Sequence, residues 1–130
     1  MLAALDDLGV RYAILTNGWS PFQEEKARLI GFRAPVYVSE RIGLRKPQRE
    51  AFAFLGRQFG LPLDAIWYLG NDANLDCAGA RSAGLIAVWF DWEGRPYPAD
   101  IEPANHVIHK LEDLPDLLQG RPSEAAKPDL

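Results

Sequence analysis

Short polar and acidic side chains cluster directly after an apolar run in the second half of the chain. The run is Ile66–Leu69. Asn71, Asp72 and Asp76 follow it, ahead of a segment of small residues. This order predicts a strand, an acidic loop and a helix, with the acids at the carboxyl end of the strand. Ligands bind at that edge of open α/β sheets. Carboxylates gathered there can hold a divalent cation beside a phosphate or another anionic substrate.

Two further polar loops carry the other groups that such chemistry needs. Thr16 and Asn17 follow the apolar run Tyr12–Leu15, which predicts a second buried strand that ends in a polar loop. Arg45 and Lys46 form a basic loop just ahead of a proline. If the strands are parallel, the first loop and the acidic loop meet at one edge of the sheet. A hydroxyl, an amide, an amine and a carboxylate pair would then converge, which is the set that phosphoryl transfer requires.

The elements that must position these loops alternate between strands and helices. Apolar runs predict the strands, and helical spacing with terminal glycines and prolines predicts the helices. This alternation indicates a doubly wound, mostly parallel sheet, that is, a Rossmann-like three-layer α/β sandwich. The predicted strands lie at 12–15, 36–38, 66–69, 85–90 and 106–108, and the predicted helices at 2–8, 21–30, 47–59, 75–83 and 111–118.

The composition is that of one ordinary globular domain. The 130 residues are 48% hydrophobic and 25% charged, with a formal net charge of -4 that argues against a nucleic-acid partner. Cys77 is the only cysteine, so no intrachain disulfide forms, and we expect a reducing, cytoplasmic location. No apolar run reaches the roughly 20 residues of a membrane span. We expect a domain over residues 1–118 and a disordered tail over 119–130.

In this order and spacing, the three polar loops resemble signatures of the haloacid dehalogenase-like (HAD) hydrolase superfamily, whose members are mostly phosphatases. ILTNG at Ile14–Gly18 resembles the second signature of the family. RKPQREAF at Arg45–Phe52 resembles the third, in subfamilies with a helical cap. The segment Gly70–Gly84 resembles the fourth, acidic signature. The resemblance runs from about residue 2 to residue 118 and implies a HAD-type core.

The resemblance implies roles for the residues of the first two loops. Thr16 would bind the transferring phosphoryl group, and the Asn17 amide would add a second contact to it. Lys46 would be the catalytic cation, because it steadies both the nucleophile and the phosphoryl charge. The expected substrate is therefore a small phosphorylated or otherwise anionic molecule.

The acidic loop implies a Mg²⁺ site formed by Asn71, Asp72 and Asp76. Asn71 stands where the family's usual form has its first acid, and Asp76 matches the second acid. Asp72 lies one residue after the position of the first acid. A neutral amide supplies a carbonyl ligand but no charge, so we expect Mg²⁺ to be held weakly.

The family's first signature, an apolar strand ending in Asp-x-Asp with the nucleophile, is not found ahead of the second signature, and neither is a cap. That strand would lie between the strands at Tyr12–Leu15 and Ile66–Leu69. We expect one of three outcomes: direct closure of the gap, a strand supplied by a partner or a second subunit in a homodimer, or a longer polypeptide. Asp91, in Asp-x-Glu-Gly after a predicted strand, is a remote candidate for a replacement nucleophile.

Two functional hypotheses follow from this pattern. The first is a phosphatase-type HAD hydrolase that is inactive as this chain alone, because its nucleophilic aspartate lies elsewhere. The second is a non-catalytic binding or regulatory remnant of the fold. A receiver domain of a two-component regulator is a weaker alternative, because its acidic pair would follow an early strand.

Several of these residues also have plain structural interpretations. Asp72 can be a helix N-cap, and Asp76 can complement the dipole of the same helix. Cys77 is expected to be a packed thiol rather than a nucleophile. His106 and His109 are expected to be structural or surface residues.

Overall fold

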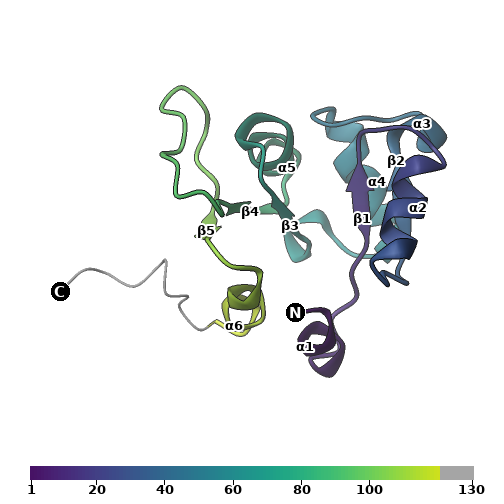
Figure 1. Cartoon of the computed structure of the whole chain (residues 1–130). Helices are drawn as coiled ribbons and strands as arrows, with labels where there is room; N and C mark the ends of the chain where they lie inside the picture. The colour runs from purple at the N-terminus through teal and green to yellow at the C-terminus, as the bar shows by residue number, and fades with distance from the viewer. Residues whose placement is uncertain (121–130) are drawn as a thin grey trace.

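The computed structural model of the chain describes residues 1–120 (Figure 1), and its helices and strands alternate as predicted. The five strands coincide with the predicted ones to within two residues at each end, and the predicted α/β class is confirmed. The elements are α1 Leu2–Asp7, β1 Ile14–Thr16, α2 Phe22–Leu29, β2 Val36–Val38, α3 Ser39–Ile42, α4 Arg49–Phe59, β3 Trp67–Gly70, α5 Gly79–Ala83, β4 Ile86–Phe90, β5 His106–Ile108 and α6 Leu114–Leu118, with 3₁₀ turns at Leu63–Ala65 and Leu111–Asp113 and a π-helix at Ala73–Ala78.

The strands form two separate parallel sheets. One sheet pairs β1 with β2, and Leu15 lies opposite Tyr37 in its register. The other has the order β3-β4-β5, with Gly70 opposite Trp89. Within residues 1–120, β1 and β3 do not pair, and Figure 1 shows them apart. The edges left unpaired are the ones between which the family resemblance places a further strand, and of the three expected outcomes direct closure of the gap does not occur.

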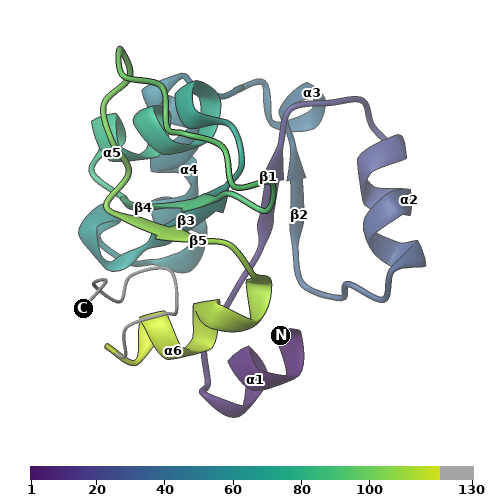
Figure 2. The ribbon, with the colours of Figure 1, turned by 60° about the vertical axis from the view of Figure 1, so that its left-hand side comes forward.

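Helices cover both faces of the three-stranded sheet, which gives the three layers (Figure 2). On one face, α4 and α5 pack through Phe52, Leu55 and Ala80. On the other face, α1 and α6 pack through Leu5 and Leu117, among others. Apolar side chains on both faces of β4 are therefore buried away from water, which is the arrangement that parallel sheets require.

Close packing between α4 and α5 depends on one glycine. The Phe52 ring is fully buried and meets the Tyr68 ring edge-on, with 5.1 Å between the ring centroids. A Cβ atom at Gly79 would lie 2.9 Å from the Phe52 ring, which is closer than side-chain carbons approach one another. Gly79 thus lets α5 approach the helix that carries Phe52.

The ends of two helices differ from the sequence pattern. Ser20 stands before Pro21 as an N-cap residue would, but α2 starts at Phe22 and the Ser20 hydroxyl donates to Glu24 at 2.7 Å. Pro115 is accommodated in the first turn of α6, where no backbone N–H is needed. Of the predicted tail, residues 121–130 lie outside the described residues. No helix in the described part of the chain is both long and apolar enough to cross a membrane.

Candidate active site

A buried ion pair joins two of the three predicted loops. The Lys46 amine lies 2.5 Å from Oδ1 of Asp76, and their side chains are only 12% and 6% exposed. Each charge is largely removed from water, so each depends on the other for compensation. The pair holds the basic loop after α3 against the π-helix that follows β3.

The second oxygen of Asp76 and the glycine that ends β3 fix the carboxylate in place. Oδ2 of Asp76 accepts a hydrogen bond from the backbone N–H of Asp72 at 3.0 Å. A Cβ atom at Gly70 would lie 2.3 Å from Cβ of Asp76, so only glycine leaves room for the carboxylate there. Both carboxylate oxygens are thereby committed within the chain.

The Asn17 side chain ties the end of β1 to the same basic loop. Its amide nitrogen donates to the Lys46 carbonyl at 2.9 Å, and its Oδ1 accepts from the Lys46 backbone N–H at 2.9 Å. This two-way pairing positions Lys46 directly beside the loop of Thr16, whose hydroxyl donates to the Asn17 carbonyl at 3.2 Å. The structure thus brings Thr16, Asn17, Lys46 and Asp76 together, and it uses the Asn17 side chain to position the lysine.

The other two predicted metal ligands serve the helix that follows β3. Oδ1 of Asp72 accepts from the backbone N–H groups of Asn74 and Leu75, at 2.9 and 2.8 Å, so Asp72 is the N-cap of the π-helix. The Asn71 side chain is exposed, and its backbone carbonyl accepts from the Trp89 indole at 2.9 Å.

These donors do not form a cation site by themselves. Asp76 is committed to Lys46 and to a backbone N–H, and Asp72 to a helix end. Within residues 1–120, no group of three or more Asp, Glu, His or Cys side chains is placed to hold a metal ion. Since Mg²⁺ takes octahedral oxygen coordination, Asn71, Asp72 and Asp76 supply at most part of its shell.

Tyr68 is a residue of the site that the sequence pattern did not single out. Its hydroxyl donates to the Leu15 carbonyl at 2.9 Å, across the unpaired edges of β3 and β1. The Lys46 amine nitrogen lies over the Tyr68 ring, 5.6 Å from the ring centroid. Burial, reinforced by the charge of Asp76, raises the pKa of Tyr68 far above its ordinary value, so the hydroxyl remains a neutral donor. A side chain with a polar hydroxyl within an otherwise apolar strand was the available signal.

Cys77 lies in the core behind the acidic loop. Its side chain is fully buried, and burial with the nearby charges of Asp76 and Asp72 raises the pKa of the thiol to about 12. A protonated, inaccessible thiol is not a nucleophile. The structure therefore agrees with the interpretation of Cys77 as a packed side chain.

Asp91 and the two histidines support the loop after β4. Asp91 is buried, and its Oδ1 accepts from the Arg95 backbone N–H at 3.0 Å. Its carbonyl oxygen lies 2.6 Å from Nδ1 of the exposed His109 ring. His106 stacks on Trp67, with 4.9 Å between the ring centroids. These contacts give Asp91 a loop-closing role, and they give it no contact with Lys46.

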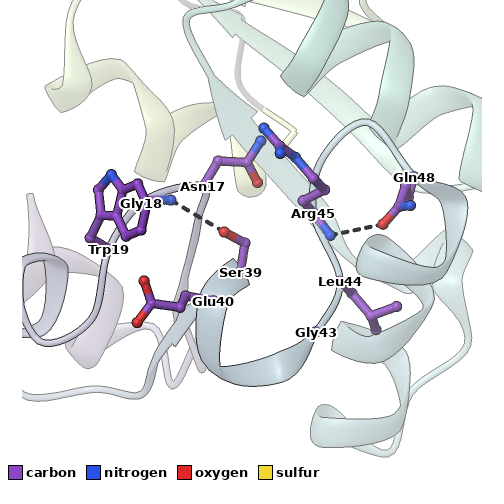
Figure 3. A pocket seen from close by; sticks show the side chains of 9 residues that line it. All are labelled: Asn17, Gly18, Trp19, Ser39, Glu40, Gly43, Leu44, Arg45 and Gln48. Atoms are coloured by element: carbon purple, nitrogen blue, oxygen red, sulfur yellow. Dashed lines mark hydrogen bonds between the residues drawn. The ribbon is translucent and has the colours of Figure 1, made fainter.

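A cavity of about 590 Å³ opens beside the site (Figure 3). It lies between the loop after β1 and the segment formed by α3 and the basic loop. Asn17 lines it, so the cavity and the ion-paired lysine share a wall. A smaller cavity of about 270 Å³ lies on the far side, next to Asn71 and Asp72. The lining residues of the larger cavity are Asn17, Gly18, Trp19, Ser39, Glu40, Gly43, Leu44, Arg45 and Gln48.

Two named enzymes are similar to the chain over most of its length. It is 31% identical over 110 residues to pyrimidine 5'-nucleotidase YjjG of Escherichia coli, covering 80% of the chain and 49% of the relative. It is 34% identical over 98 residues to phosphoserine phosphatase of Thermus thermophilus, covering 73% of the chain and 39% of the relative. The chain thus spans about half the length, or less, of these relatives.

Solved structures share the same fold. A HAD phosphatase from Thermococcus onnurineus superposes with a TM-score of 0.81 and 26% identity, over 92% of this chain and 55% of that one. The magnesium-bound HAD-hydrolase YfnB of Bacillus subtilis gives a TM-score of 0.78 and 28% identity, over 90% and 54%. A family model described as haloacid dehalogenase-like hydrolase matches residues 1–84. The chain therefore belongs to the haloacid dehalogenase-like hydrolase family.

Proposed function

We propose that this chain is the phosphoryl-binding part of a phosphomonoester hydrolase. One observation carries the proposal: the nearly buried Lys46 amine is paired with Asp76, and the Asn17 side chain bridges the Lys46 backbone, at the point where β1 and β3 end with unpaired edges. A cation fixed in this way stabilises charge that develops on a phosphoryl group without reorganising during the reaction.

In the proposed reaction, an aspartate supplied from outside the described residues attacks phosphorus, and the bond to the leaving alcohol breaks. Water then hydrolyses the aspartyl phosphate and releases inorganic phosphate. The Lys46 amine would contact the phosphoryl oxygens and the attacking carboxylate, and the Thr16 hydroxyl would donate to a further oxygen. Asn17 would hold the lysine in place through its backbone and could donate its remaining N–H to the phosphoryl group.

Magnesium binding would need further ligands. The relative YfnB has been crystallised with magnesium, and the family resemblance points to Asn71, Asp72 and Asp76 as ligands here. Because Asp76 is paired with Lys46 and Asp72 caps a helix, we propose that a carboxylate beyond these residues must complete the site. No step of the proposed reaction is assigned to the metal in this chain.

The strand that carries the missing aspartate would be inserted between the unpaired edges of β1 and β3. A strand inserted between them would pair with both edges, and its carboxyl end would lie close to Thr16 and Lys46. We propose that a longer polypeptide, a partner or a second copy supplies this strand. Light scattering tests the second copy directly, because a mass at the monomer value of 14.5 kDa counts against it.

Phosphate binding and turnover test the proposal separately. We expect the 130-residue chain to bind inorganic phosphate, detected by ³¹P NMR titration, and to lose this binding in Lys46→Gln. Lys26→Gln on the exposed face of α2 is the matched control and should bind normally. We also expect no significant hydrolysis of p-nitrophenyl phosphate by the chain alone. Robust Mg²⁺-dependent hydrolysis that is lost in Asp72→Ala would contradict the missing-nucleophile part of the proposal.

The second candidate is a non-catalytic binding or regulatory module, favoured by the same unpaired strand edges. Activity does not separate the two functions, since both predict little turnover by this chain. The coding DNA upstream of Met1 does separate them. An in-frame strand ending in Asp-x-Asp supports the hydrolase, and a clean start supports the binding module. For either function we propose a cytoplasmic protein with a small phosphorylated ligand and no nucleic-acid partner.

A further inference from the structure

The cavity of about 590 Å³ beside Asn17 is lined by charged side chains that no residue of the described part of the chain pairs with. Arg45 and Glu40 both line it, and within residues 1–120 neither the guanidinium nor the carboxylate forms an ion pair or a side-chain hydrogen bond. Neighbouring charges of the same types are paired: Arg41 lies 3.0 Å from Glu24, and Lys46 lies 2.5 Å from Asp76. The cavity therefore presents a free cation and a free anion to a ligand.

The walls that carry these two charges are anchored. The Gly18 N–H donates to the Ser39 hydroxyl at 3.2 Å, which joins the loop after β1 to the start of α3. The Arg45 N–H donates to Oε1 of Gln48 at 3.0 Å, which fixes the backbone of the basic loop. A ligand would thus meet a cavity whose backbone is already in place, so binding would cost little ordering.

An aromatic surface completes the cavity. The Trp19 side chain is 73% exposed at its rim, and in Figure 3 it lies on the same side as Glu40. An indole left in water offers a face for the carbon skeleton of a small ligand. Since most of the Trp19 side chain is in water, packing within the described part of the chain does not account for it.

The cavity is connected to the phosphoryl site through adjacent residues. Arg45 and Lys46 are neighbours in sequence. Lys46 reaches Asp76, whereas Arg45 lines the cavity, where Figure 3 shows its guanidinium extending towards Asn17. A molecule whose phosphoryl group is bound by Lys46 can therefore extend past Asn17 into the cavity.

We infer that this cavity binds the organic part of the substrate, and that this part carries a carboxylate together with an N–H or O–H donor. Arg45 would pair with the carboxylate, Glu40 would accept from the donor, and Trp19 would cover the carbon skeleton. The ligand class is a phosphorylated amino acid or hydroxy acid. This inference rests on the proposed phosphoryl site, and it adds a specificity pocket formed by α3 and the basic loop.

Four probes that carry different sets of these groups test the pocket by ³¹P NMR titration of the 130-residue chain. They are inorganic phosphate, O-phosphoethanolamine (a donor without a carboxylate), 2-phosphoglycolate (a carboxylate without a donor) and O-phosphoserine (both). We expect O-phosphoserine to bind about three- to tenfold more tightly than O-phosphoethanolamine, the range of a partly exposed charge-assisted contact. Arg45→Gln should abolish this ratio. Arg33→Gln, an exposed arginine outside the cavity, should keep the ratio.

The donor part of the inference has its own comparison. Glu40→Gln should reduce the preference for O-phosphoserine over 2-phosphoglycolate, and it should leave the affinity for 2-phosphoglycolate equal or higher. If O-phosphoserine and O-phosphoethanolamine bind equally, or if Arg45→Gln keeps their ratio, the pocket assignment is wrong while the phosphoryl site stands. If none of the four probes binds, the phosphoryl site is wrong and the pocket assignment fails with it.

Discussion

Replacing Asp76 with asparagine should lower the free energy of unfolding by about 2–4 kcal/mol, because it breaks a nearly buried ion pair. The Lys46 amine beside it is only 12% exposed, so water can compensate little of the lost charge. In Asp76 one carboxylate oxygen faces the Lys46 amine, and the other, Oδ2, accepts a hydrogen bond from the Asp72 backbone N–H. The NH₂ group of an asparagine at this position would have to point at one of these two donors. One donor is therefore left without an acceptor in either orientation, at a cost of about 1–3 kcal/mol.

Urea unfolding followed by far-ultraviolet circular dichroism measures this loss, and a double-mutant cycle isolates the pair. Lys46→Met should also destabilise the chain, because it leaves the Asp76 carboxylate without its cation. We expect the double variant Lys46→Met with Asp76→Asn to lose about 1–3 kcal/mol less than the sum of the two single losses, since it leaves neither charge uncompensated.

An exposed ion pair provides the control. Arg28 and Glu25 on α2 are 70% and 53% exposed, so Arg28→Gln should leave stability close to that of the parent chain. The reasoning is refuted if Asp76→Asn costs no more than Arg28→Gln, or if the losses of the two single variants of the buried pair add without coupling.

Three further changes probe the surroundings of the site. Gly70→Ala should destabilise the chain by about 1–3 kcal/mol in a thermal melt, because its Cβ would lie 2.3 Å from Asp76; a loss below 0.5 kcal/mol would mean that the acidic loop shifts freely. Tyr68→Phe should cost about 1 kcal/mol in urea unfolding, since the Leu15 carbonyl loses its donor, and an unchanged midpoint would show that water replaces the hydroxyl. The folded pKa of Cys77, raised from about 9 to about 12, favours the neutral thiol, so its stabilising effect is present below pH 9 and is lost as the pH rises towards 12. Cys77→Ala should therefore flatten the stability profile between pH 9 and 12, and a parallel profile would contradict this.

The strands were predictable because each is a short apolar run that stops at a polar loop. Ile86–Phe90 and Val36–Val38 have this form and match the structure closely. The helix α3 was not predicted, and the segment Ala73–Ala78 was predicted only in part, as the start of a helix at 75–83 and not as a π-helix. The start of α2 was also not predictable from a local pattern. The Ser20 hydroxyl donates to Glu24 and accepts from Arg41, which is 21 residues away, and a capping pattern carries no information on such a partner.

The convergence of Thr16, Lys46 and Asp76 was also predictable, because parallel strands bring their carboxyl ends to one edge. The contacts that hold these three residues together were not predictable from the sequence. Asn17 could be recognised as a polar residue of the loop, but its pairing with the Lys46 backbone depends on how two loops meet in three dimensions. The hydrogen bond from Tyr68 to Leu15 likewise depends on two strand edges that remain unpaired.

The split sheet has a consequence for how the chain opens. Among the described residues no backbone ladder joins β1 to β3, and side-chain contacts link the β1–β2 part to the β3–β5 part, among them the Tyr68 hydroxyl, the Lys46–Asp76 pair and the packing of Leu15 in the core. Cooperative units of a protein separate where few such links connect them. The two parts should therefore behave as distinct foldons. Amide hydrogens of β1 and β2 would exchange with solvent through a local opening of low free energy, and those of the central strand β4 would exchange only through global unfolding.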